Sequence, residues 1–112
     1  MAAASSRTEL LPGTLEMLIL RRLTLGPLHG YGIAQHIEQS SQGVLRVEQG
    51  SLYPALERLL RKGRVTARWS KSPTGRRARY YTITASGRAL LSSKMEDYER
   101  VIGAIGRVMA EG

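Results

Sequence analysis

The side chains in this sequence that are best suited to chemistry are those that bind nucleic acid. Between residues 49 and 61, the positions outside the apolar pattern carry amide, hydroxyl, carboxylate and guanidinium groups. Amide and guanidinium groups can hydrogen-bond to base edges in a bidentate manner, and hydroxyl groups suit phosphate oxygens. This face consists of Gln49, Ser51, Tyr53, Glu57, Arg58 and Arg61, and we expect all of them except Glu57 to contact DNA.

A second group of candidate residues surrounds the segment 72–75, which is rich in turn formers. Its cations are Lys71, Arg76, Arg77 and Arg79. Between residues 58 and 95 the sequence contains no Asp or Glu, whereas Lys and Arg recur throughout. This segregation favours an arm that contacts phosphates or the minor groove. The alternative is that these cations form only a solvated face.

The overall charge points to the same kind of partner. The 112 residues include 17 Lys and Arg against 9 Asp and Glu, a formal net charge of +8. Such an excess favours a polyanionic partner, with nucleic acid ahead of an anionic membrane surface.

Catalytic and metal-binding patterns are not found in the sequence. It has no cysteine, no nucleophile–base pair and no glycine-rich phosphate loop. His29 and His36 lack a carboxylate or thiol cluster, and His29 is expected to start a helix instead. We therefore expect no enzyme activity, no cofactor and no metal site. Since residues 1–6 do not resemble a signal peptide and the apolar stretch 15–20 is short, a cytoplasmic location is expected.

Three helices are predicted in the first half of the chain. The first begins after an N-cap at Thr14 and ends at Gly26-Pro27, and the second runs from about Gly30 to residue 40. A short extended connector at 45–48 leads to a third helix, which starts near Gly50 or Ser51 and stops at residue 63. This start would place its proline, at position 54, in the first turn, where a missing amide is tolerated.

The pattern then changes from helical to strand periodicity. Alternation over residues 65–70 predicts a half-buried strand, and 76–83 predicts the return strand of a hairpin. Trp69 is expected in the core. Tyr80 and Tyr81 alternate faces, so at least one of them should be structural.

A last helix is predicted from an N-cap at Thr84 to about residue 110. Its apolar positions alternate steps of four and three, the spacing of a coiled-coil seam. The seam consists of Leu91, Met95, Tyr98, Ile102, Ile105 and Met109. We expect it to join two copies of the chain, the alternative being that it packs on the chain's own first helix.

Together these elements describe a mainly α-helical fold with a small β-hairpin, a winged helix-turn-helix followed by a C-terminal dimerisation helix. The expected organisation is a flexible N-terminus over residues 1–10, the winged helix-turn-helix over 11–84 and the dimerisation helix over 85–112.

Five stretches of the sequence resemble the PadR family of bacterial transcriptional regulators, in its short form with one C-terminal helix. They are Gly13-Thr14-Leu15-Glu16, Gly26-Pro27-Leu28-His29-Gly30-Tyr31-Gly32-Ile33, Gly50-Ser51-Leu52-Tyr53-Pro54-Ala55-Leu56, Gly75-Arg76-Arg77-Ala78-Arg79-Tyr80-Tyr81 and Thr84-Ala85-Ser86-Gly87. The resemblance covers about residues 11–109. It implies a homodimer on a pseudo-palindromic operator, usually acting as a repressor, with Tyr31, Ser51, Tyr53 and the cations of the hairpin near DNA.

Two function classes remain open from the sequence. The first is a sequence-specific repressor that binds duplex DNA as a homodimer and is released by a small-molecule effector. The second is a winged-helix module that binds RNA or another protein without operator specificity. Gly103 and Gly106 leave the dimer geometry open, because each weakens the last helix by about 1 kcal/mol relative to Ala or lets two helices approach closely.

Overall fold

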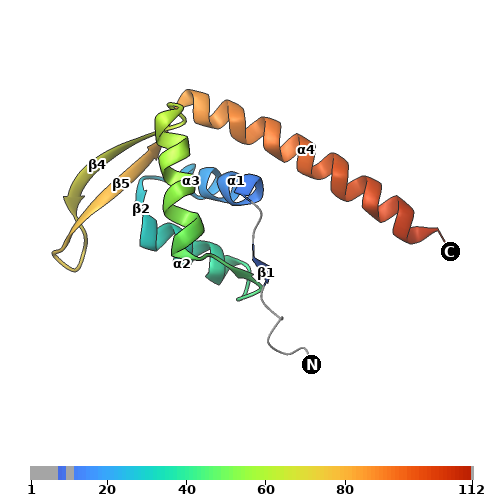
Figure 1. Ribbon diagram of the computed structural model, residues 1–112, viewed down its shortest axis with the longest axis horizontal. Helices are drawn as coiled ribbons and strands as arrows, with labels where there is room; N and C mark the ends of the chain where they lie inside the picture. The colour runs from blue at the N-terminus through green and yellow to red at the C-terminus, as the bar shows by residue number, and fades with distance from the viewer. Residues whose placement is uncertain (1–7, 10–11, 112) are drawn as a thin grey trace.

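The computed structural model describes residues 8–9 and 12–111 (Figure 1). Its helices are α1 (Pro12–Leu23), α2 (Gly30–Ser40), α3 (Gln49–Arg61) and α4 (Ala85–Ala110). Its strands are β1 (Thr8–Glu9), β2 (Leu28–His29), β3 (Leu45–Arg46), β4 (Val65–Lys71) and β5 (Arg77–Ile83). The predicted fold class, a winged helix-turn-helix with a long last helix, is confirmed.

The core lies between α1, α2 and α3 and is closed on one side by the sheet. Apolar residues at helical spacing supply it, and the largest fully buried side chains are Leu15, Ile19, Leu20, Leu23, Ile33, Leu52, Leu56, Leu59 and Val65. His29 caps α2 as expected, since its Nδ1 accepts a hydrogen bond from the Gly32 N–H at 3.0 Å. Gly63 follows α3 with a φ of +73°, a left-handed conformation that suits glycine at a helix end.

The start of α3 differs from the prediction. The helix begins at Gln49 with Glu48 as the N-cap, so Pro54 lies in the second turn and not in the first. Pro54 cannot donate the hydrogen bond that the Gly50 carbonyl would otherwise accept. Gly50 is exposed, so water can satisfy its carbonyl group.

The hairpin is confirmed, and a third strand joins it. β4 and β5 pair antiparallel with Val65 opposite Ile83, and β2 pairs with the other edge of β5. Tyr81 is buried in the core, whereas Tyr80 lies edge-to-face against the His29 ring at 5.2 Å. We call the β4–β5 hairpin, with its turn at 72–76, the wing.

The prediction that Trp69 lies in the core is wrong. Its side chain is 58% exposed, because the wing extends beyond the end of the helical core (Figure 1). The alternating pattern gives Trp69 the same face of the sheet as Val65 and Ala67, but no helix covers the sheet that far out.

The flexible terminus predicted for residues 1–10 lies outside the described residues except for Thr8–Glu9. These two residues form β1, which pairs in parallel with β3.

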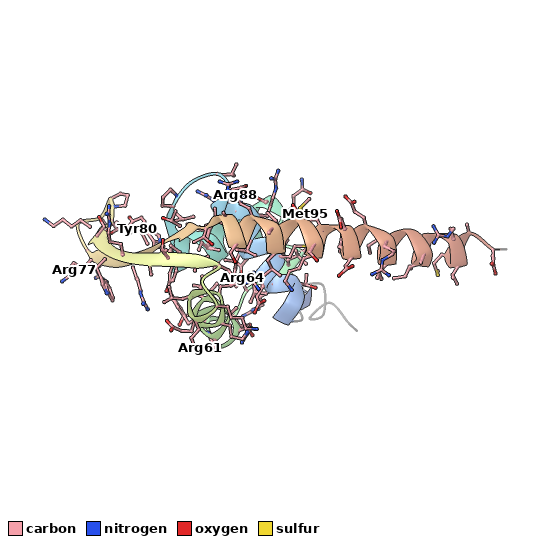
Figure 2. The ribbon with its side chains drawn as sticks, turned by 90° about the horizontal axis from the view of Figure 1, so that it is seen from above. Arg61, Arg64, Arg77, Tyr80, Arg88 and Met95 are labelled. Atoms are coloured by element: carbon pink, nitrogen blue, oxygen red, sulfur yellow. The ribbon has the colours of Figure 1, made fainter. Side chains whose placement is uncertain are left out.

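Helix α4 begins against the α3–β4 turn and then leaves the core. Thr84 caps it as predicted, with its Oγ1 accepting a hydrogen bond from the Gly87 N–H at 3.0 Å. Leu91 is buried in the core, but from Met95 onward the helix projects away, on the side opposite to the wing (Figures 1 and 2).

Candidate nucleic-acid interface

A groove lies between the wing and the helices α2 and α3, with a volume of about 1030 Å³. One wall is the outer face of α3. The other wall is the face of the wing that carries Trp69 and Tyr81, the same face that packs on the core nearer the helices. The charged and aromatic residues that line it are His29, Tyr31, Tyr53, Glu57, Trp69, Arg76, Arg77, Arg79 and Tyr81. A concave surface of this composition can hold a phosphate backbone against cations and hydroxyl groups.

The arginines of the wing are held in different ways. The Nη1 of Arg79 lies 3.0 Å from Oε2 of Glu57 on α3, and its guanidinium lies 5.9 Å from the centre of the Tyr81 ring. Burial raises the pKa of Tyr81, while the neighbouring Arg79 charge lowers it. Arg77 stacks over the ring of Trp69 at 5.5 Å. In the described part of the chain, Arg76 and Lys71 form no ion pair.

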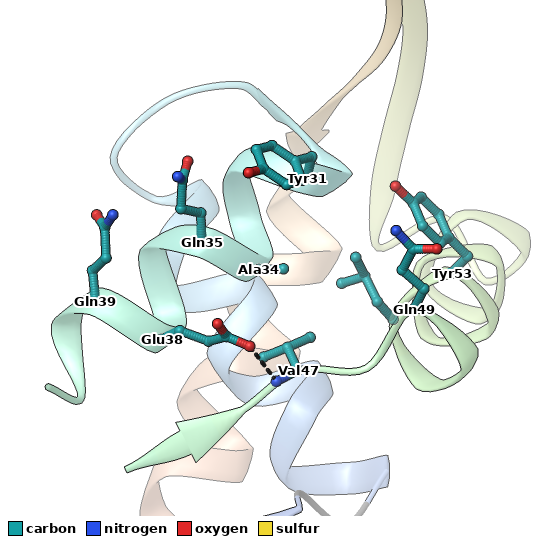
Figure 3. A pocket seen from close by; sticks show the side chains of 9 residues that line it. Tyr31, Ala34, Gln35, Glu38, Gln39, Val47, Gln49 and Tyr53 are labelled. Atoms are coloured by element: carbon teal, nitrogen blue, oxygen red, sulfur yellow. Dashed lines mark hydrogen bonds between the residues drawn. The ribbon is translucent and has the colours of Figure 1, made fainter. Parts of the chain in front are cut away.

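A smaller pocket of about 350 Å³ lies next to the groove, between α2 and the start of α3 (Figure 3). Ala34 and Val47 give it apolar walls, and Gln35, Gln49 and Tyr53 bring amide and hydroxyl groups to it. The Oε2 of Glu38 accepts a hydrogen bond from the Val47 N–H at 2.9 Å, which fixes the connector before α3 to α2. The pocket is therefore bounded by α2, the connector that Glu38 holds and the start of α3.

Gly30 sets the distance between α2 and α3 at this place. A Cβ atom on Gly30 would lie 2.8 Å from Cε1 and 3.1 Å from the hydroxyl of Tyr53. The Tyr53 ring thus packs on the first turn of α2, beside Tyr31 in the same turn. This packing was not foreseen from the sequence, although a glycine opening a helix is a signal of close approach.

The groove unites only part of the predicted DNA-binding set. Tyr31, Tyr53, Arg76, Arg77 and Arg79 line it, and Gln49 lines the adjacent pocket. Ser51, Arg61 and Lys71 are exposed outside it. Figure 2 shows Arg77 near the tip of the wing and Arg61 on α3, away from that tip.

Arg58 lies on a different flank of α3. Its Nε is 2.9 Å from Oε2 of Glu16 on α1, and Nζ of Lys94 on α4 is 3.9 Å from the other oxygen of Glu16. The carboxylate of Glu16 therefore ties together α1, α3 and α4. A base-reading role for Arg58 would require this pair to break.

Trp69 and Glu57 line the groove but were not in the predicted DNA-binding set. Trp69 lies opposite Arg79 in the β4–β5 pairing, so both side chains are on the same face of the wing. This register would have placed Trp69 in the groove, but the sequence alone does not give the length of the wing. Glu57 was placed on the outer face of the third helix but not among the DNA contacts, and its carboxylate opposes a phosphate backbone.

The predicted seam on α4 divides into two parts. Leu91 belongs to the core of its own chain, so it does not face a partner. The remaining positions are exposed to between 38% and 76%, namely Met95, Tyr98, Ile102, Ile105 and Met109. Val101 and Val108 widen this apolar face. Beyond Leu91 the seam therefore does not pack on α1.

The described residues, 8–9 and 12–111, contain no group of three or more His, Cys, Asp or Glu that could hold a metal ion. None of their helices is both long and apolar enough to cross a membrane.

Known sequences include relatives that match most of this chain. The transcriptional regulator PadR-like family matches residues 19–93, more than half of the chain. Uncharacterized protein X of Lysinibacillus sphaericus is 28% identical over 95 residues, 85% of this chain and 87% of its own length. An uncharacterized 37.1 kDa transposon protein of Streptomyces fradiae is 40% identical over 90 residues, 80% of this chain, which spans only 24% of that relative.

Solved structures agree with the family match. A transcriptional regulator from Clostridium thermocellum is 26% identical, with a TM-score of 0.77 and coverage of 85% of this chain and 92% of that one. A PadR-like transcription factor from Bacteroides fragilis is also 26% identical, with a TM-score of 0.69 and coverage of 87% and 91%. A protein from Streptococcus mutans, 24% identical with a TM-score of 0.81 over 93% of both chains, shares the fold. The chain thus belongs to the PadR-like family and is a transcriptional regulator.

Proposed function

We propose that this regulator is a repressor that binds duplex DNA in the groove between α3 and the wing. The observation that carries the proposal is the groove itself, in which α3 and the arginines of the wing face the same concave space. A recognition helix reads base edges in the major groove, and a basic wing beside it contacts phosphates or the minor groove. The protein acts in the cytoplasm and has no enzymatic step in its action.

We further propose that two copies bind one operator. The exposed apolar face of α4 from Met95 to Met109 supports this part, because a contiguous apolar face of this kind is rarely left uncovered. On a pseudo-palindromic operator the two α3 helices must lie on successive major-groove faces, about 34–36 Å apart, and we propose that paired α4 helices hold them at this spacing. Occupation of such an operator excludes the polymerase.

Release by a small molecule completes the proposal. A ligand changes DNA affinity only if it binds one arrangement of the dimer better than the other. The apolar seam on α4 supports this part, since a ligand between two such faces would alter the spacing of the two α3 helices. A screen of effectors that leaves operator affinity unchanged throughout would remove this part and leave DNA binding intact.

The test is binding to a duplex from the region upstream of the protein's own gene. The complex is titrated with random-sequence competitor at two salt concentrations, and its stoichiometry is measured. Retention at a large excess of competitor with two protomers per duplex is the expected result. Loss of the complex to competitor and salt together, with preferential binding to structured RNA at matched salt, would favour the RNA-binding module instead.

A further inference from the structure

Among the described residues, Glu57 is the only carboxylate that lines the groove. It lies one helical turn after Tyr53 on the outer face of α3, and its side chain is 51% exposed. Apart from Glu57, the Asp, Glu, Lys and Arg side chains that line the groove are all arginines. A carboxylate at this place repels any phosphate backbone. It therefore lowers the affinity of the groove for DNA of arbitrary sequence.

Glu57 also forms an ion pair with one of the three arginines that line the groove. Nη1 of Arg79 is 3.0 Å from Oε2 of Glu57, whereas Arg77 stacks on Trp69 and Arg76 is exposed and forms no ion pair among the described residues. The pair is half-exposed on both sides, at 35% for Arg79 and 51% for Glu57. Pairs this exposed are weak because water screens both charges, so either partner can exchange to a new ligand at small cost.

From this geometry we propose that Glu57 is a specificity-determining residue that reads the amino group of a cytosine and frees Arg79 for a phosphate. The inference rests on the proposed binding of duplex DNA by the groove. Cytosine N4 donates to a carboxylate in the major groove, whereas guanine presents only acceptors there and thymine an acceptor and a methyl group. Adenine also has a donor, N6, but its N7 acceptor lies beside it and opposes the second carboxylate oxygen. On a duplex without the cytosine, Glu57 stays on Arg79 and faces at least one acceptor or phosphate. The Glu57–Arg79 ion pair therefore lowers the affinity for a duplex without the cytosine. On a duplex with the cytosine, the pair is replaced by a contact from Glu57 to the base and a contact from Arg79 to a phosphate.

The experiment compares five proteins on DNA selected from a randomised duplex library. They are the wild type, Glu57→Gln, Arg79→Gln, the double variant, and Glu96→Gln as a control that changes net charge equally on α4, outside the groove. For each we measure the base preference, the affinity for random duplex and the slope of log affinity against log salt. Urea unfolding accompanies each variant and should give unchanged midpoints, because the pair is exposed.

We expect Glu57→Gln to lose a cytosine preference at one base pair of each half-site. Its ratio of operator to random-duplex affinity should fall by about tenfold, within the range that one good base contact supplies. Its salt slope on random duplex should steepen by about one unit, because Arg79 becomes available to a phosphate. This steepening should be absent in the double variant, and Glu96→Gln should match the wild type.

Two failures are distinguishable. If the wild type enriches no sequence from the library, duplex-specific binding itself is wrong, and the role of Glu57 falls with it. If the wild type enriches a sequence but Glu57→Gln keeps the same base preference and the same salt slope, only the inference on Glu57 is overturned. An equal change of preference in Glu96→Gln would also overturn it, because net charge alone would then explain the effect.

Discussion

At the scale of single residues, the cations of the wing differ in what holds them in the free protein. Arg79 is paired with Glu57, and Arg77 stacks on Trp69, whereas Arg76 near the turn is exposed and makes no ion pair in the described structure. A free cation can move to a phosphate without giving up a partner. Arg76 is therefore the residue whose removal reports phosphate binding most directly.

We predict that Arg76→Gln weakens binding to all duplexes about equally. The slope of log affinity against log salt should become shallower by about one unit for each phosphate that the variant no longer binds. Titrations of operator and random duplex over a range of salt concentrations measure this. Arg107→Gln, which removes an exposed cation near the end of α4, is the matched control and should leave the slope unchanged. A changed base preference in Arg76→Gln would show that the wing reads bases.

Ser51 provides the complementary prediction for α3. It is exposed in the first turn of the helix, and its hydroxyl has no partner in the described structure. We expect Ser51→Ala to relax selectivity at one base pair by about 1 kcal/mol, because a hydroxyl can make one hydrogen bond to a base edge. Library selection checks this, with Ser93→Ala on α4 as the control. Uniform weakening across sequences would instead assign Ser51 to a phosphate.

At the scale of elements, the joint between α4 and the rest of the fold is unusually tight. The Thr84 hydroxyl lies 2.7 Å from the Gly63 carbonyl and 2.9 Å from that of Arg64, and the Thr84 N–H donates to the latter at 3.1 Å. Gly87 completes the joint, because a Cβ there would collide with the Arg64 carbonyl and lie 2.8 Å from Ile83. The end of α3 and the start of α4 are thus fixed relative to each other.

We predict that Gly87→Ala lowers the free energy of unfolding by about 1–3 kcal/mol, since backbone must shift to admit the methyl group. Urea denaturation measures the decrease. Gly50→Ala is the control, because Gly50 is also helical and a Cβ there meets nothing within 4 Å. Equal stability of the two variants would mean that α4 can shift away from the α3–β4 turn at little cost.

How far the elements could be predicted depends on how local their causes are. The caps His29 and Thr84 were predictable, because each hydrogen bond joins residues three positions apart. The N-cap predicted at Thr14 is wrong, since α1 already begins at Pro12. Strand β2 was not, since two residues carry no periodicity and its partner β5 lies far along the chain. Periodicity gave the face of Trp69 and Leu91 but not their burial, which depends on where the core ends. The same limit applies to the site, where the pairing of Arg58 with Glu16 depends on the packing of α1 against α3.

At the scale of the whole molecule, the two functional surfaces point in different directions. The described chain measures 55 × 36 × 21 Å, and the wing and α4 project from opposite sides of the helical core (Figure 1). Helix α4 is 26 residues long, about 39 Å, yet only its first turns contact the core. Because the joint at Gly87 is tight, any change in how two α4 helices pack would be transmitted to the position of α3.

The prediction at this scale is that Ile102→Asp separates the dimer and abolishes tight operator binding. Ile102 lies in the middle of the exposed apolar face and is 48% exposed, so a buried charge there would remain unpaired in a dimer. Sedimentation should show a monomer, and unfolding of that monomer should remain cooperative because Ile102 is outside the core. Ser93→Asp introduces the same charge on another face of α4 and should remain a dimer. A wild type that is monomeric at every concentration, or an Ile102→Asp variant that binds the operator as tightly as the wild type, would contradict the prediction. If operator affinity disappears together with the dimer, two α3 helices on one rigid frame, and not the groove of one chain, provide tight binding.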